Sequence, residues 1–110
     1  VIDRGSLMQL IKASEFTADR AWGSQIIALM QGISTRLHWT DEDYVWHIND
    51  GEEVFVVLDG QVRMYYRHDD LEVSALLNVG DIFKVDIGEA HKACPIGEAR
   101  VLVVERSGSI

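Results

Sequence analysis

The chain has 110 residues, 47% of them hydrophobic and 25% charged, which suits one folded domain over residues 1–110 and does not suit a disordered chain. Its formal net charge of −8, without any cluster of lysines or arginines, argues against a nucleic-acid partner. No apolar run is long enough to span a bilayer, residues 1–6 lack a signal-peptide pattern, and Cys94 is the only cysteine, so we expect a cytoplasmic protein without a membrane partner or an intrachain disulfide.

The first third of the chain carries a weak pattern followed by a clear one. Apolar residues at helical spacing favour a short helix or an edge strand over residues 7–14, and residues 17–22 suit one helical turn. Residues 33–39 alternate, with Ser34, Arg36 and His38 on the polar face. We expect this face to be exposed to solvent. If it lines the inside of a barrel instead, Arg36 is placed to bind a substrate carboxylate.

From residue 50 onward, turn signals recur at nearly even intervals. They are Asp50-Gly51, Asp59-Gly60, His68-Asp69-Asp70, Val79-Gly80-Asp81, Ile87-Gly88-Glu89 and Pro95-Ile96-Gly97. The segments between them are rich in β-branched and aromatic residues, which predicts strands over 53–58, 61–67, 71–77, 82–86 and 99–105. This rhythm of short strands is typical of an antiparallel all-β sandwich or barrel.

The residues able to bind a metal begin just before the first of these turns. On a strand, His47 and Asn49 project from the same face, because side chains alternate. The Asp50-Gly51 turn then reverses the chain and brings Glu53 back beside them. His91 follows the bend permitted by Gly88, and it faces this cluster if the sheet closes. Two imidazoles and a carboxylate at one point make a plausible divalent-metal site.

These residues carry a resemblance to the cupin superfamily. The first cupin motif places His, His, Glu and Gly at the intervals of His47, Asn49, Glu53 and Gly60, so that Asn49 stands where the second histidine is usual. The second motif is matched by the positions of Gly80, Asp86, Gly88, His91 and Pro95, with Asp86 in place of proline and Pro95 in place of asparagine. The resemblance implies a jelly-roll barrel, which is an antiparallel double-stranded β-helix.

The resemblance also implies a site and two readings of its function. The expected metal ligands are His47, Asn49, Glu53 and His91, holding a divalent ion such as iron, manganese, zinc or nickel. One reading is a metal-dependent enzyme, of isomerase, lyase or dioxygenase type, acting on a small oxygen-rich metabolite. The other is a non-catalytic module that binds a small molecule such as a sugar, in which Asn49 and Asp86 mark a lapsed metal site. Both remain open at this point.

The same strand parity predicts how the chain assembles. Phe55 and Val57 should face inward with Glu53, which leaves Val54, Val56 and Leu58 on the outer face. A strand that is apolar on both faces is covered on both faces. Because cupins commonly dimerise through such strands, we expect a homodimer.

Overall fold

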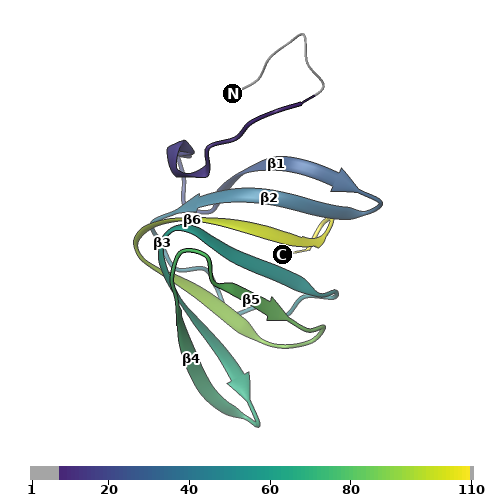
Figure 1. The fold of residues 1–110 in the computed structure, drawn as a ribbon. Helices are drawn as coiled ribbons and strands as arrows, with labels where there is room; N and C mark the ends of the chain where they lie inside the picture. The colour runs from purple at the N-terminus through teal and green to yellow at the C-terminus, as the bar shows by residue number, and fades with distance from the viewer. Residues whose placement is uncertain (1–7, 110) are drawn as a thin grey trace.

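The computed structural model describes residues 8–109, and nearly all of their regular structure is antiparallel β (Figure 1). The elements in chain order are the 3-10 helix η1 (Ala13–Glu15) and the strands β1 (Gly23–Met30), β2 (Ile33–Thr40), β3 (Glu53–His68), β4 (Leu71–Leu77), β5 (Ile82–Val85) and β6 (His91–Arg106). The strands lie in the order β1-β2-β6-β3-β4, and β5 pairs with β3. The predicted antiparallel all-β class is confirmed.

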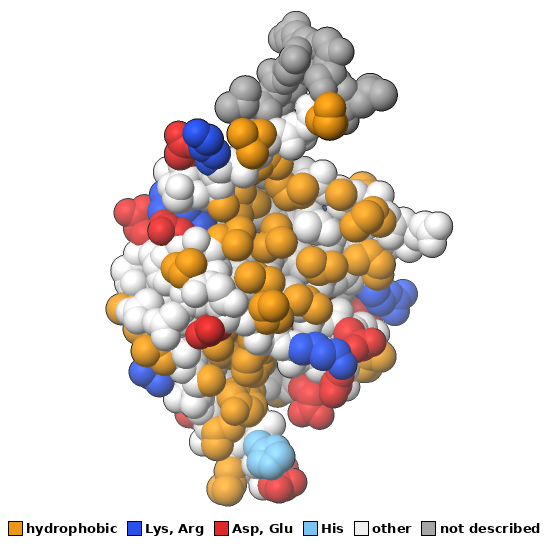
Figure 2. Space-filling model, viewed as in Figure 1, with side chains coloured by type: hydrophobic (Ala, Val, Ile, Leu, Met, Phe, Trp, Pro, Cys, Tyr) orange, Lys and Arg blue, Asp and Glu red, His pale blue; other side chains and the backbone are white. Residues whose placement is uncertain are grey.

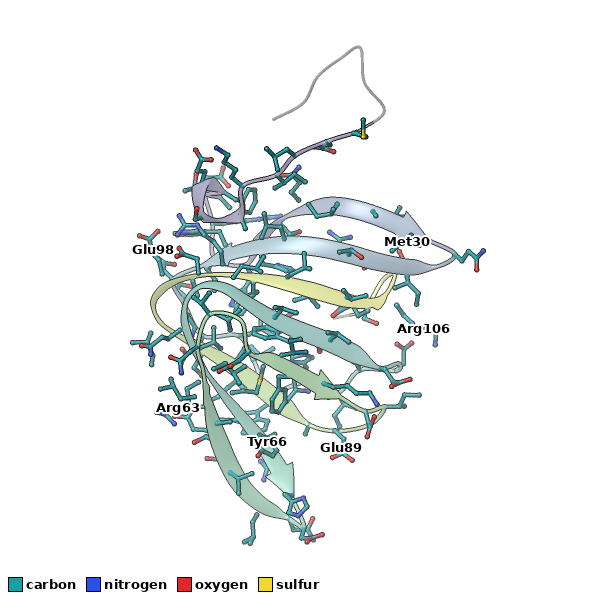
Figure 3. All side chains as sticks on the ribbon, in the orientation of Figure 1. Met30, Arg63, Tyr66, Glu89, Glu98 and Arg106 are labelled. Atoms are coloured by element: carbon teal, nitrogen blue, oxygen red, sulfur yellow. The ribbon has the colours of Figure 1, made fainter. Side chains whose placement is uncertain are left out.

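The centre of the fold is a two-stranded ribbon made by β3 and β6. The two strands pair along nearly their whole length, from Glu53 opposite Glu105 to Tyr66 opposite His91. The register shifts around Asp59, where the ribbon bends. In Figure 3, the label Glu98 lies at this bend, whereas Arg106 and Glu89, close to the two ends of β6, lie on the opposite side of the molecule. The ribbon is therefore folded back on itself.

The bend depends on a glycine. Gly60 has a φ of 78°, and a Cβ at this position would collide with the carbonyl oxygen of Glu98 on β6. Side chains other than glycine rarely adopt this backbone conformation. Gly97, on the partner strand, also has a positive φ, of 71°. The bend therefore needs glycine at position 60 both for its backbone conformation and for the close approach of β6.

Folding the ribbon brings its two ends together. Glu53 and Tyr66 are thirteen residues apart, which corresponds to ~43 Å along a straight strand. Nevertheless, Oε1 of Glu53 lies 2.9 Å from Nε2 of His91, the residue paired with Tyr66. This long-range closure places the first and second sequence motifs in one site.

Two of the predicted turns are wrong. The predicted strands 53–58 and 61–67 are halves of the single strand β3, and the predicted turn at 95–97 lies within β6. Both segments contain a glycine with positive φ, as a turn does, but here the two strands bend together and keep their pairing. The glycines therefore predicted the local backbone conformation correctly, but the pairing of β3 with β6 makes each position a bend within a strand and not a turn between strands.

The segment before β1 is less helical than the sequence predicted. Within the predicted helix or edge strand over 7–14, the described residues form only a β-bridge at Gln9 and the beginning of η1, and no helical turn forms over 17–22. Residue 7, and residues 1–6 where no signal peptide was seen, lie outside the described residues. Within 8–109 there is no helix with the length and apolarity needed to cross a membrane.

The predicted inner and outer faces of β3 are confirmed. Glu53, Phe55 and Val57 are buried, whereas Val54 and Val56 on the outer face are only partly buried. The core inside the folded ribbon also contains Val62, Met64, Leu77, Ala93, Ala99, Val101 and Val103. The site described next adjoins this core, because Phe55, Met64, Ala93 and Val103 also line its cavity.

Candidate metal site

The two predicted histidines lie directly opposite each other. His47 and His91 form an isolated antiparallel bridge, in which each backbone N–H donates to the other residue's carbonyl oxygen at 3.1 Å. Their imidazole rings are 4.1 Å apart between centroids. The short segment that carries His47 is thereby fixed to the beginning of β6, which orients both rings toward the same point.

Glu53 and Asn49 complete the predicted set. The Glu53 side chain is only 6% exposed, and its Oε1 accepts hydrogen bonds from Nδ2 of Asn49 at 2.6 Å and from Nε2 of His91 at 2.9 Å. His47, Glu53 and His91 each offer one ligand atom, and these atoms all lie within 4.8 Å of one another. The structure therefore brings all four predicted residues together.

The ring nitrogens of both histidines are oriented by the backbone. Nδ1 of His47 lies 2.9 Å from the carbonyl oxygen of Val45, and Nδ1 of His91 lies 3.0 Å from that of Glu89. A carbonyl oxygen only accepts hydrogen bonds, so each Nδ1 carries a proton. In the neutral imidazole, Nε2 is then the atom with the free lone pair. Metal-binding histidines are commonly oriented in this way.

The contact between His91 and Glu53 needs a positive charge. With its proton on Nδ1, a neutral His91 would place the lone pair of Nε2 against a carboxylate oxygen at 2.9 Å. Either a second proton on the imidazole or a cation beside the two groups removes this repulsion. Burial by itself lowers the pKa of His91, but the hydrogen bonds to Glu53 and to the carbonyl of Glu89 outweigh it and raise that pKa.

His47 differs from His91 in its protonation. Burial lowers the pKa of His47, and the nearby His91 lowers it further, against the hydrogen bond to Val45. Its Nε2 has no hydrogen-bond partner within residues 8–109. His47 therefore presents a neutral imidazole with a free lone pair, the form in which histidine binds a metal.

One buried atom in the cluster has no partner. Because the Glu53 carboxylate accepts from Nδ2 of Asn49, the amide orientation is fixed, and Oδ1 of Asn49 is buried without a hydrogen bond within the described residues. Leaving such an oxygen unpaired costs about 1–3 kcal/mol. A bound cation or an ordered water satisfies it. The donor set of two imidazoles, one carboxylate and one spare amide oxygen thus fits a divalent metal.

The cluster lies at the wall of a cavity of about 250 Å³. The cavity is also lined by residues outside the predicted metal set, of which the sequence analysis had considered only Arg36 for ligand binding. They are Trp22, Ser24, Ser34, Arg36, His38, Tyr44 and Glu105. The expectation that Arg36 and His38 face solvent is wrong, because both line the cavity. The alternation of β2 was predicted, but the pattern did not say which face turns inward.

Glu105 is a further acidic group in this cavity. It lies opposite Glu53 in the pairing of β3 with β6. Burial, followed by the negative charge of Glu53, raises the pKa of Glu105 to about 7. The strand 99–105 was predicted, and inward alternation from Val101 and Val103 was the signal that places Glu105 inside.

No protein-family model and no curated protein sequence matches this chain. Solved structures do match it. A cupin-2 domain-containing protein of Shewanella frigidimarina is similar, with 26% identity, a TM-score of 0.69 and coverage of 81% of this chain and 84% of that one. A cupin superfamily protein of Desulfitobacterium hafniense has 18% identity, a TM-score of 0.73 and coverage of 92% of each chain.

An enzyme is also among the similar structures. Hydroquinone 1,2-dioxygenase in complex with Fe3+ has 15% identity and a TM-score of 0.72, and the match covers 82% of this chain but 29% of that one. Such low identity is evidence of a shared fold and not of a shared reaction.

Proposed function

This chain has the fold of the cupin superfamily, as its two motifs predicted, and we propose that it binds a divalent metal ion through His47, Glu53 and His91 and acts on a small oxygen-rich metabolite in the adjoining cavity. The observation that carries the proposal is the orientation of the two imidazoles. In each, Nδ1 is held by a backbone carbonyl, so that Nε2 is the atom directed at the cluster. Nε2 of His47 has no hydrogen-bond partner among the described residues, and Nε2 of His91 contacts the buried Glu53 carboxylate.

Asn49 has a positioning role in this proposal. Its Nδ2 holds the Glu53 carboxylate against His91, and its buried Oδ1 remains available to the ion or to a water bound to it. With one imidazole fewer than the usual cupin set, the site favours iron or manganese over copper, and zinc and nickel also suit its donors.

The remaining cavity residues complete the proposed chemistry. His47, Glu53 and His91 would hold the ion, which when bound would supply a Lewis acid for a substrate oxygen or a centre for dioxygen, depending on the metal. Glu105 can exchange a proton near neutral pH, because its pKa is raised to about 7. Trp22 and Tyr44 pack edge-to-face, with 5.3 Å between ring centroids, and form an apolar wall that limits water in the cavity. Isomerase, lyase and dioxygenase reactions are all compatible with these groups.

A non-catalytic binding module is the second candidate, favoured by the asparagine at position 49 where the motif has histidine. Metal analysis of protein purified without chelator and without nickel affinity resin separates the two candidates. We expect about one iron, manganese or zinc ion per chain in the wild type and in His68→Ala, whose histidine side chain is 77% exposed, and loss of the ion in His47→Ala. Protein that stays metal-free after reconstitution, yet binds a small ligand, would support the module instead.

A further inference from the structure

Arg36 brings a positive charge into the cavity and makes no ion pair with a described residue, although the carboxyl group of Glu105 is near enough for this charge to oppose the rise in its pKa. Its Nη1 donates to Oγ of Ser24 at 3.2 Å, which uses one of the five N–H donors of a guanidinium. Among residues 8–109, no carboxylate lies within 4.0 Å of it, although Arg36 is half-buried and lines the cavity. A partly desolvated guanidinium with open donors is a site for an anion, above all a planar carboxylate.

The position of Arg36 relative to the metal site follows from the sheet register. Arg36 of β2 pairs with Val103 of β6, which in turn pairs with Phe55 of β3. Neighbouring strands are ~4.8 Å apart, so the Cα atoms of Arg36 and Phe55 are separated by roughly 10 Å. Glu53 lies two residues before Phe55 on the same inner face. A molecule in the cavity can therefore contact Arg36 at one end and the metal cluster at the other.

Cavity size and charge limit what that molecule is. The volume of about 250 Å³ gives the cavity room for a small metabolite. When the site holds a divalent ion, the ion and Arg36 together carry more positive charge than Glu53 and Glu105 can neutralise. An anionic ligand is then favoured over a neutral one of the same shape.

We propose that the cavity selects a small organic acid, whose carboxylate pairs with Arg36 while a second oxygen, a 2-hydroxy or 2-oxo group, is directed at the metal cluster. This inference rests on the proposed function and narrows its substrate class. It assigns to Arg36 the recognition of the ligand's charge, a role distinct from holding the metal.

Matched pairs of ligands test the charge recognition. Lactate and pyruvate are compared with lactamide and pyruvamide, which replace the carboxylate by a neutral amide, using calorimetric titration of protein whose metal content is measured in the same sample. In metal-loaded wild type we expect each acid to bind at least tenfold more tightly than its amide, as removal of a charge-assisted pair predicts. In Arg36→Gln we expect acid and amide to bind within about twofold of each other, with metal content unchanged.

Arg63→Gln is the matched control. Nη1 of Arg63 also donates to a serine, Oγ of Ser74 at 3.4 Å, but Arg63 does not line the cavity; its label in Figure 3 lies near the bend of the sheet. This variant should keep the wild-type preference. Equal binding of acid and amide to wild type, no binding of any of the four ligands, or a preference retained in Arg36→Gln would overturn the proposal.

The two proposals fail in different measurements. The metal proposal is refuted if the metal content of the protein stays near zero after reconstitution, whatever the ligand titrations show. Without the ion, Glu53 and Glu105 outweigh the single charge of Arg36, so chelator-treated wild type should show little preference for the acid. The charge-recognition proposal fails on its own when metal-loaded wild type binds acid and amide equally. If the protein holds no metal and the acid and amide bind equally, both proposals are refuted.

Discussion

Replacing Asn49 by alanine should weaken metal binding while leaving the metal-free fold nearly as stable. The substitution removes the 2.6 Å hydrogen bond from Nδ2 to the Glu53 carboxylate, a bond to a charged acceptor worth about 1.5–3 kcal/mol. It also removes the buried, unpaired Oδ1, whose burial costs about 1–3 kcal/mol. Because these contributions oppose each other, the free energy of unfolding in excess chelator should change by no more than about 1 kcal/mol.

The metal-bound state has no such compensation. In the proposed metal-bound state, Oδ1 would have the ion or its water as a partner, and Asn49→Ala would remove the group that orients Glu53. Loss of a hydrogen bond to a metal ligand typically reduces affinity 10–100-fold. We therefore expect the dissociation constant for manganese or zinc to be 10–100-fold larger in Asn49→Ala than in the wild type, measured by competition with a fluorescent chelator.

The control for this experiment is Asn78→Ala. Asn78 also makes a side-chain hydrogen bond, accepting at Oδ1 from Nε2 of Gln61 at 2.7 Å, but it is exposed and far from the cluster. It should bind metal like the wild type. An Asn49→Ala protein that binds metal within twofold of the wild type would refute the positioning role of Asn49. A decrease of several kcal/mol in the free energy of unfolding of Asn49→Ala in excess chelator would show that the two contributions do not cancel.

Three further predictions follow from other parts of the fold. Gly60→Ala should destabilise the protein in urea by about 1–3 kcal/mol more than Gly80→Ala, since both glycines have positive φ but only a Cβ at Gly60 meets the backbone of Glu98; equal costs would contradict the bend. The pKa of Glu105 is raised from 4.5 to about 7 in the folded protein, so between these pH values the folded state binds a proton that the unfolded state has lost. In chelator, the free energy of unfolding of the wild type should therefore fall relative to that of Glu105→Gln as pH rises from about 4.5 to 7, and parallel pH profiles of the two proteins in urea would contradict this. The wild type should be a homodimer in light scattering and Ile82→Glu a monomer, because Ile82 is 67% exposed at the edge of an apolar outer row; a monomeric wild type would reject the homodimer.

The homodimer prediction is supported by an apolar surface on the outer face of the sheet. Figure 2 shows apolar side chains gathered over the face formed by β1, β2, β6 and β3. Across this outer face, the register aligns Leu37, Leu102, Val56 and Ile82 in one row. Leu37 is 1% exposed and Ile82 is 67% exposed, so the row runs from a covered end to an open one. A second copy of the chain is the partner that the sequence analysis expected there.

The sequence predicted the residues of the candidate metal cluster better than the cavity around it. His47, Glu53 and His91 were found because the two motifs fix ligand types at set intervals along the chain. The fold that the motifs imply closes the sheet, and this closure brings the two motifs together. Their convergence across the folded ribbon is confirmed by the 2.9 Å contact between Glu53 and His91. The unpaired Oδ1 of Asn49 has no sequence signal, since it depends on the hydrogen bonds of its neighbours.

Arg36 was expected on the solvent face, with a carboxylate-binding role only if that face lines the barrel, and Glu105 was not assigned to the site, for a related reason. Strand alternation in β2 separates two faces, but it assigns neither of them to the interior without a neighbouring strand as reference. That reference is the pairing of β2 with β6, where Arg36 lies opposite the buried Val103. Likewise, Gly60 predicted a positive φ, which is the conformation found. A tight turn and a bend in a paired ribbon both use that conformation, so the glycine alone does not tell one from the other. Only long-range pairing distinguishes them.

The most direct test of the central claim is a crystal structure of the metal-loaded protein with anomalous diffraction recorded at the absorption edge of the metal. We predict one anomalous peak per chain, at roughly 2.0–2.2 Å from Nε2 of His47, Nε2 of His91 and a carboxylate oxygen of Glu53. A loaded crystal with its anomalous peak elsewhere, or with the Glu53 and His91 side chains still in direct contact and no ion beside them, would contradict the account.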